Sequence, residues 1–278
     1  MSVDTLTINL NTKTVLVMGL PGSGKTTFAK KLCELLGDAS NGGIGRVKHF
    51  NADAIRQLYN DWDFSEEGRM RQAVRMKDLA DKANADGYHA VCDFVCPSPK
   101  AQELFKHDIV VFMDTIKEGR FEDTNKVFQR PQHFMWWIQS WEESDDTLLD
   151  VALDLTSDEF DYSKPTVQML GRYQPFHDGH KALFEEALKK TGQVAIMVRT
   201  MPKSDKNPFD QFKVEREIVK KLKDYLGKFT IVWVPNLVDI SYGRDVGYTI
   251  SKIELPEDIQ AISATKIREE MRKNGEGI

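Results

Sequence analysis

Gly19-Leu20-Pro21-Gly22-Ser23-Gly24-Lys25-Thr26 decides how the first half of this 278-residue chain is organised. The stretch fits the pattern G-x-x-x-x-G-K-[ST] of a phosphate-binding loop. It follows a β-branched run at 14–18 and precedes apolar residues at helical spacing over 26–36. Glycines let the backbone N–H groups turn toward phosphate oxygens, and the start of a helix adds partial positive charge. The pattern therefore predicts a site for the phosphates of ATP.

Each residue type in the loop has an expected task. We expect Lys25 to reach the β- and γ-phosphates and the Thr26 hydroxyl to hold Mg²⁺. The predicted ATP-binding residues are Gly19, Pro21, Gly22, Ser23, Gly24, Lys25, Thr26 and Thr27. Asp93 ends a short apolar strand, where it is either an outer-sphere Mg²⁺ ligand or a cap of the strand end.

A second group of polar residues follows the next predicted strand. Asp53 stands at a strand end that faces the phosphates, so we expect it to take the proton of a substrate hydroxyl. Arg56 would neutralise an anionic acceptor. Arg69, Gln72 and Arg75 recur at three-residue spacing on one helix face, which is either an acceptor site or a solvated face. The predicted acceptor-binding residues are Arg56, Arg69, Gln72 and Arg75.

Residues 19–114 resemble the adenylylsulfate kinase family. The resemblance rests on the loop at 19–27, on the segment 51–56, and on Phe64-Ser65 followed by Arg69, Gln72 and Arg75. It implies ATP-dependent phosphorylation of a hydroxyl on a nucleotide-like acceptor. The sequence departs from the family at Gln72, where an Asn is usual, at Asn51, where an Asp is usual, and over the lid segment 119–125. The acceptor is therefore left open, and polynucleotide kinases are a weaker analogy.

The second half carries another phosphate-binding pattern, Gly171-Arg172-Tyr173-Gln174-Pro175-Phe176-His177-Asp178-Gly179-His180, directly after a predicted strand at 167–170. His177 and His180 stand where a loop becomes a helix, so their ring nitrogens can bind a nucleoside triphosphate and stabilise the departing pyrophosphate. Further along, Ser263, Thr265 and Arg268 begin a helix and predict an anion site there.

These two motifs resemble the nucleotidylyltransferase superfamily with His-x-Gly-His and Ile-Ser-x-Thr-x-x-Arg, over residues 165–274. The opening at 171–177 and the stretch 207–209 are most similar to short nicotinamide-mononucleotide adenylyltransferases, and cytidylyltransferases share the core motifs. The resemblance implies attack of a phosphate on the α-phosphorus of ATP or CTP with Mg²⁺. The residues expected to bind this nucleotide are Gly171, Arg172, His177, Gly179, His180, Lys203, Ser263, Thr265 and Arg268. The expected catalytic residues of both halves are Lys25, Asp53, His177, His180 and Arg268.

Composition indicates where the chain divides. Residues 142–161 hold nine acidic residues and no Lys or Arg, and Lys164-Pro165 then precedes a new apolar run. Residues 1–163 have a net charge of −9 and residues 164–278 a net charge of +4. We expect a P-loop kinase domain at 1–163 and a nucleotidylyltransferase domain at 164–278. Strand and helix patterns alternate in both, which predicts two tandem three-layer α/β/α domains with parallel sheets.

Whole-chain composition narrows the functional class. Hydrophobic residues are 41% and charged residues 29% of the chain, which is ordinary for globular proteins. The net charge of −5 argues against nonspecific nucleic-acid binding, and no apolar stretch is long enough to span a membrane. Three cysteines and a start without a signal-peptide pattern favour the cytoplasm. The expected partners are small-molecule substrates, and a homodimer is compatible with the sequence.

Two further features are interpreted as structural. Trp136, Trp137 and Trp141, with Phe134 and Met135, form a dense aromatic patch that we expect to pack in a core or domain interface rather than to serve as a base-stacking platform. Cys92 and Cys96 have no second pair of ligands, so buried thiols are expected rather than a zinc site. A glycine-flanked polar element at 242–248 has no assigned role.

The leading hypothesis is a bifunctional enzyme with a kinase followed by a nucleotidylyltransferase. One alternative is sulfate activation, in which the second domain makes adenylylsulfate and the first phosphorylates it. Another is pyridine-nucleotide salvage by a nucleoside kinase and a mononucleotide adenylyltransferase. A nucleotide-sensing module without activity is the non-enzymatic alternative, which predicts decay of Lys25, Asp53, His177 or His180, and all four are present.

Overall fold

The computed structural model describes residues 11–40, 45–241, 243 and 249–275. Within the element at 242–248, only Gly243 is among them. The chain divides into two compact units, Met1–Leu155 and Thr156–Ile278. This division lies before the predicted boundary between Ser163 and Lys164.

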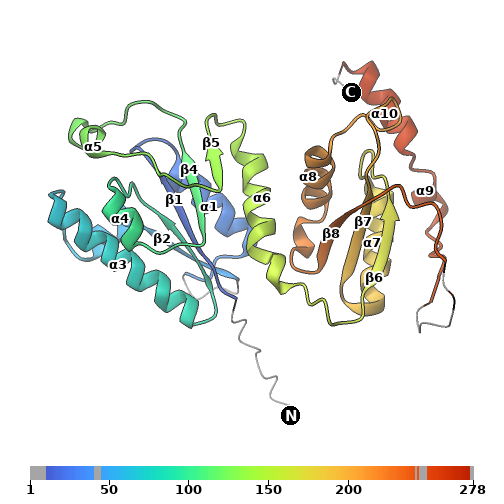
Figure 1. Cartoon of the computed structure of the whole chain (residues 1–278), viewed down its shortest axis with the longest axis horizontal. Helices are drawn as coiled ribbons and strands as arrows, with labels where there is room; N and C mark the ends of the chain where they lie inside the picture. The colour runs from blue at the N-terminus through green and yellow to red at the C-terminus, as the bar shows by residue number, and fades with distance from the viewer. Residues whose placement is uncertain (1–10, 41–44, 242, 244–248, 276–278) are drawn as a thin grey trace, which may run out of the picture. The chain divides into compact units, whose positions relative to one another are not determined.

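The first unit is built on a five-stranded parallel sheet in the order β2-β3-β1-β4-β5 (Figure 1). Its strands are β1 (Thr14–Gly19), β2 (Val47–Asn51), β3 (His89–Asp93), β4 (Ile109–Met113) and β5 (Trp136–Ile138). Its helices are α1 (Lys25–Leu36), α2 (Ala52–Leu58), α3 (Glu66–Ala85), α4 (Pro99–Leu104), α5 (Glu122–Val127) and α6 (Ser144–Thr156).

Alternation along the strands explains why helices cover the sheet on both faces. Leu16 and Met18 of β1 lie in one buried cluster with Met76 of α3 and Phe105, which directly follows α4. Val15 and Val17 are equally buried but point the other way, toward the face that α1 covers. Buried on both faces, the strands read as continuous apolar runs.

The register of the strands brings the polar residues of the first unit to one edge. Val17 of β1 and Asn51 of β2 both pair with Asp93 of β3. The loop after β1, the start of α2 and the end of β3 therefore meet at the carboxyl edge of the sheet, where open α/β sheets bind ligands.

The second unit has a three-stranded parallel sheet in the order β6-β7-β8 (Figure 1). Its strands are β6 (Val167–Gly171), β7 (Val194–Arg199) and β8 (Phe229–Val234). Its α-helices are α7 (Asp178–Thr191), α8 (Gln211–Lys221), α9 (Glu257–Gln260) and α10 (Ala264–Lys273), with 3₁₀ turns at Ser157–Glu159 and Lys223–Tyr225. Phe184 of α7 and Ile218 of α8 are fully buried, as are Val194 and Ile196 of β7.

These sheets confirm the predicted fold class of two tandem three-layer α/β/α domains with parallel strands. Among the described residues, no helix combines the length and the apolarity that crossing a bilayer requires. Cys92 and Cys96 are buried free thiols, and burial raises the pKa of both.

The expectation of core packing does not hold for four of the five residues of the aromatic patch, whereas Trp136 in β5 is half-buried. The alternative of a domain interface stays a prediction. Phe134, Met135, Trp137 and Trp141 are all exposed. Trp137 lies against Phe134 and under the Arg130 guanidinium, and its indole N–H donates to Asp114 at 3.2 Å. β5 is the outermost strand of the sheet, so residues in and next to it have fewer neighbouring elements to bury them than residues of the central strands.

Candidate functional site

A cavity of about 660 Å³ lies at the carboxyl edge of the first sheet. Its wall includes the phosphate-binding loop, the start of α2, the end of β3 and part of α3. The predicted site residues in the wall are Pro21, Gly22, Gly24, Lys25, Thr26, Thr27, Asp53, Arg56, Arg69, Gln72 and Asp93. The structure thus brings together residues that the sequence separates by up to seventy positions.

The loop residue Gly24 has a conformation that only glycine adopts without strain. Its φ is +93°, and a Cβ built on it would lie 1.7 Å from Cη2 of Trp141. Any side chain at position 24 would therefore displace either the loop or the indole ring.

Lys25 is buried beneath the loop. Its Nζ donates to the carbonyl of Leu20 at 2.9 Å. Burial lowers the pKa of Lys25 to about 8, and the nearby carboxylates of Asp93 and Asp53 oppose that shift. An ammonium that has lost water in this way gains more from an arriving phosphate than an exposed one does.

A polar cluster surrounds Asp93, which is buried. One carboxylate oxygen accepts from the Thr26 hydroxyl at 2.5 Å and from the Asn51 amide at 2.8 Å. The other lies 2.6 Å from Nε2 of His49. Asn51 also accepts from the backbone N–H of Ala54 and so caps α2. An Asp at position 51 would face Asp93 with a like charge, whereas Asn donates to it.

The residues of this cluster fit Mg²⁺. Thr26 and Asp93 offer hard oxygen atoms, which Mg²⁺ prefers, and it is usually bound by one or two such groups together with substrate phosphates. No group of three or more His, Cys, Asp or Glu side chains that fits a metal occurs in the described part of the chain.

Asp53 lies in the first turn of α2, exposed and in the cavity wall. The buried Gln72 donates from its amide to the carbonyl of Ala52 at 3.1 Å. Gln72 therefore ties the start of α2 to α3 and fixes the backbone beside Asp53.

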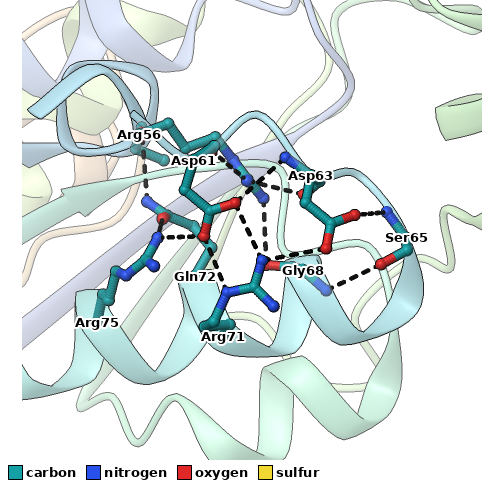
Figure 2. A network of polar contacts seen from close by, with 9 residues as sticks. Arg56, Asp61, Asp63, Ser65, Gly68, Arg71, Gln72 and Arg75 are labelled. Carbon is teal, nitrogen blue, oxygen red and sulfur yellow. Dashed lines mark hydrogen bonds and ion pairs between the residues drawn. The ribbon is translucent and has the colours of Figure 1, made fainter. Parts of the chain in front are cut away.

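Arg56 is buried, and most of its donors are used within the protein (Figure 2). It donates to the backbone carbonyls of Asp61 at 3.0 Å and Asp63 at 2.9 Å, with a longer contact to Gly68. Its guanidinium lies 4.7 Å from the ring centre of Phe64. Burial lowers the pKa of Arg56, opposed by Asp61. Arg56 thus holds the 61–68 loop as well as lining the cavity.

Asp61 is the anionic centre of the network in Figure 2. Its carboxylate accepts from Arg71 at 2.9 Å and 3.0 Å and pairs with Arg75 at 2.7 Å. Arg71 also bonds Asp63 at 3.0 Å. These hydrogen bonds hold the pKa of Asp61 well below its usual range. The network fixes the loop that carries Trp62 and Phe64 into the cavity wall.

The two predicted arginines of α3 have different surroundings. Arg69 lies in the cavity wall and pairs with Asp123 at 2.8 Å. Arg75 is not part of the wall; it pairs with Asp61 and lies 4.7 Å from the ring centre of Tyr59.

Sequence reasoning missed several residues of the wall or of its immediate support: His49, Trp62, Phe64, Phe121, Thr124 and Trp141. His49 and Asn51 stand two apart on β2 and so share one face, which is a signal that the sequence contained. Arg120, in the segment 119–125 that departs from the family's lid, also lies in the wall.

In the second unit, the predicted loop leads from β6 into α7. His177 and His180 have nearly parallel rings with centres 3.7 Å apart. Nδ1 of His180 accepts the backbone N–H of His177 at 3.3 Å. Burial lowers the pKa of His180 to about 3, so its ring is neutral near pH 7. Because Nδ1 is the acceptor, the proton of the neutral ring must be on Nε2.

The protonation equilibrium of the His177 ring is also shifted toward the neutral form. Burial lowers its pKa, with an opposing effect from Asp178. Its Nδ1 is buried and has no hydrogen-bond partner among the described residues. Gly179 lets this ring fold back, because a Cβ there would lie 3.1 Å from the imidazole.

The structure joins the two motifs of this unit through Arg268. Its guanidinium donates to the carbonyl of Gln174, in the histidine loop, and to the Thr265 hydroxyl at 3.2 Å. Arg268 is buried, and burial lowers its pKa together with the positive charges of Arg172 and Arg272. Three guanidinium groups near one loop make this region attractive to anions.

The remaining predicted residues of this unit make fewer contacts that would fix a binding site. Gly171 ends β6, and a Cβ there would lie 2.7 Å from the Tyr173 ring. Arg172 and Lys203 are exposed. Ser263 precedes α10 as its cap residue, but its hydroxyl makes no capping hydrogen bond.

The fold and the loop at 19–26 define the first unit as a P-loop α/β domain, and the second is a smaller parallel α/β domain. The family model described as adenylylsulphate kinase matches residues 11–126, and the one described as cytidylyltransferase-like matches residues 169–224. The chain therefore has an adenylylsulphate-kinase-like domain followed by a cytidylyltransferase-like region, as the resemblances predict. The two matches support a phosphorus-group transferase.

Similar proteins agree with the first match. A probable adenylyl-sulfate kinase of Aeropyrum pernix is 32% identical over 93 residues, which are 33% of this chain and 49% of that protein. The chain thus spans about half the length of this curated relative.

Two solved structures illustrate the range of structural neighbours. The APS kinase of Mycobacterium tuberculosis in complex with AMPPNP and APS is 20% identical with a TM-score of 0.44, over 52% of this chain and 98% of that one. Shikimate kinase from Acinetobacter baumannii in complex with shikimate is 16% identical with a TM-score of 0.36, over 55% and 97%.

Proposed function

We propose that the chain is a bifunctional enzyme, an ATP-dependent kinase joined to a nucleotidylyltransferase. One observation carries the kinase half: a single cavity is lined by Lys25, Thr26, Asp53 and Asp93. It thus combines a phosphate-binding loop, a group for Mg²⁺ and a carboxylate for the acceptor.

In the kinase half, Lys25 binds the β- and γ-phosphates. Mg²⁺, held by Thr26 with Asp93, would neutralise charge on those phosphates when bound. Asp53 accepts the proton of the acceptor hydroxyl as its oxygen forms a bond to the γ-phosphorus and ADP leaves. Arg120, in the cavity wall near Gly22, adds positive charge beside the loop.

The acceptor is a small compound with a hydroxyl group, a flat apolar part and a negative charge. Trp62, Phe64 and Phe121 provide flat apolar surface in the wall, and Arg69 provides positive charge. Arg56 contributes through Phe64 and through the loop, since its own donors are engaged. Arg75 acts from outside the wall.

In the nucleotidylyltransferase half, the neutral His180 donates from Nε2 to a phosphate oxygen, and His177 binds the same triphosphate. Arg268 stabilises the charge that appears on pyrophosphate as it leaves. The place of both rings at the start of α7 supports this role, because a helix N-terminus attracts phosphate. The incoming phosphate forms the new bond to the α-phosphorus, and the nucleotidyl donor is ATP or CTP.

The match of residues 11–126 favours sulfate activation as the second candidate, with adenylylsulfate as the acceptor of the kinase. Pyridine-nucleotide salvage is the third, on the pattern at 171–180. In each case the partners are small molecules, and we place the protein in the cytoplasm.

A substrate screen tests the proposal. Candidate acceptors are supplied with ATP or CTP, and ADP and pyrophosphate are measured separately. Lys25→Ala should abolish acceptor-dependent ADP release and leave pyrophosphate release intact, and His180→Ala should do the opposite. Release of neither product with any acceptor, in a chain that still binds nucleotide, would favour the nucleotide-sensing alternative.

A further inference from the structure

Two tryptophans of the segment after β4 look alike in the sequence and differ in the structure. Trp137 and Trp141 have exposed fractions of 41% and 47%. Trp137 is engaged by Asp114, Phe134 and Arg130 and is not part of the cavity wall. Trp141 belongs to that wall. An exposed aromatic ring in a cavity wall is a surface that a flat ligand can cover.

The edge of the Trp141 ring rests on the phosphate-binding loop. The atoms closest to a Cβ built on Gly24 are Cη2, Cζ3 and Cζ2 of Trp141, at 1.7, 2.3 and 2.7 Å. All three belong to the six-membered ring of the indole. The ring therefore stands directly beside the residue that precedes Lys25, at the end of the loop where α1 begins.

The backbone of Trp141 is held in place. Its carbonyl accepts from the backbone N–H of Ser144 at 3.2 Å and from the Ser144 hydroxyl at 2.7 Å. The next residue of α6, Asp145, pairs with Lys31 of α1 at 2.8 Å. These contacts fix the backbone beside the ring, so a ligand would have to order only the side chain of Trp141.

We propose that the Trp141 ring is the stacking surface for the base of the nucleoside triphosphate donor in the kinase site. The proposal rests on the proposed kinase function. The loop takes the phosphates, and the base follows them within one ribose. The acceptor wall of Trp62, Phe64 and Arg69 comes from α3 and the loop before it, on the side of Asp53. Trp141 contacts the loop instead, so it serves the donor.

Binding of the base and binding of the phosphates can be measured separately with two ligands. ADP carries both phosphates and base, whereas inorganic tripolyphosphate carries the phosphates alone. Binding of each to the full chain is measured by calorimetry. Under our proposal the second unit also binds nucleotide, so ADP binding can have two components. The component that disappears in the Lys25→Ala variant is the one that belongs to the phosphate-binding loop.

We expect Trp141→Ala to weaken that component for ADP by about 5- to 150-fold, the range that loss of one base–aromatic contact gives. Binding of tripolyphosphate should stay unchanged, and Trp141→Phe should recover most of the ADP affinity. Trp137→Ala is the matched control and should change neither. ADP should also quench tryptophan fluorescence in the wild-type chain and less so in Trp141→Phe.

Three results would overturn the proposal. Tighter ADP binding by Trp141→Ala would mean that the ring occupies the place of the nucleotide. Equal losses for ADP and tripolyphosphate would mean that the ring only supports the loop, and no change would mean that it does not touch the base. If no ADP binding depends on Lys25, the kinase proposal fails as well; if that binding persists and ignores Trp141, only the stacking proposal fails.

Discussion

At the scale of single residues, the kinase site separates binding from proton transfer. Lys25 is buried beneath the loop, whereas Asp53 is exposed in the cavity wall. Asp53→Asn keeps the shape of the side chain and removes its basicity. We expect acceptor-dependent ADP formation to fall by about 10²–10⁴-fold, because general base catalysis contributes that much.

The measurement is steady-state ADP release with ATP in excess, and Asp81→Asn, far along α3, is the control. ADP affinity should change little in Asp53→Asn, because the loop that binds the phosphates is untouched. ADP formation at the wild-type rate in Asp53→Asn would contradict the assignment of this residue as the base.

The histidine pair gives a second prediction at this scale. His180 donates to charge that develops as pyrophosphate leaves, so its loss should affect turnover more than nucleotide binding. His180→Ala is expected to lower pyrophosphate release by about 10²-fold or more. Parallel measurement of KM for the nucleotide checks this, since a change confined to KM would indicate a binding role only.

Stability should also depend on pH through His180. Its pKa is about 3 in the folded chain against 6.5 for an ordinary His, so the unfolded chain binds the extra proton between these values. Stability that the neutral ring provides is therefore complete above pH 6.5 and is lost as the pH falls below it. The free energy of unfolding of the second unit, measured with urea, should therefore decrease from pH 7 to pH 5. Most carboxylates remain ionised over this range, so they contribute little to the change. The same measurement on His180→Asn should show a smaller slope.

At the scale of elements, the loop between α2 and α3 is positioned by arginines of both helices. Arg71 and Arg75 bind Asp61, and Arg56 binds the loop carbonyls (Figure 2). Trp62 and Phe64 of the same loop line the cavity. Asp61 is therefore a positioning residue for the acceptor wall. Asp61→Asn should raise KM for the acceptor by about two- to tenfold, the energy of one misplaced aromatic contact, with kcat and KM for ATP nearly unchanged.

Comparing KM for the acceptor with KM for ATP shows whether Asp61 only positions the acceptor wall. General destabilisation of the unit would raise both KM values. Asp81→Asn removes the i,i+4 pair with Lys77 on the same helix and serves as control. A rise in KM for ATP of the same size as that for the acceptor would show that Asp61 supports the whole unit.

Most elements and the fold class were predictable, because buried parallel strands give continuous apolar runs such as 14–18 and 109–113. The position of the two loops, each between a strand and a helix, was predictable from spacing and context, whereas their binding roles stay predictions. The acceptor wall was not predictable, because it depends on which arginine side chains already donate hydrogen bonds within the protein. Arg56 and Arg75 carry the right charge, yet their partners are the 61–68 loop carbonyls and Asp61. Likewise, nothing in the run 134–141 indicates which tryptophan meets Gly24.

At the scale of the whole molecule, the segment 157–164 decides where the chain can be cut. The sequence predicts a boundary between Ser163 and Lys164, and the structure divides the chain after Leu155. The segment between these positions is bound to the second unit. Gln193, which is buried, donates to the carbonyl of Asp161 at 2.7 Å and to the Thr166 hydroxyl at 2.6 Å, and its amide oxygen accepts from the Asp161 N–H at 3.3 Å.

The ring of Phe160 is buried as well and meets Tyr162 edge-on at 5.0 Å. A fragment 164–278 would lose this buried ring and leave the Gln193 amide with fewer partners, whereas a fragment 156–278 keeps both. We therefore expect 156–278 to unfold at higher urea concentration than 164–278, by about 3–5 kcal/mol in the free energy of unfolding, the usual range for losing a buried Phe side chain. Phe160→Ala in the longer fragment should reproduce most of the loss. Equal stability of the two fragments would place the functional boundary at 163 and make the 157–163 segment a linker.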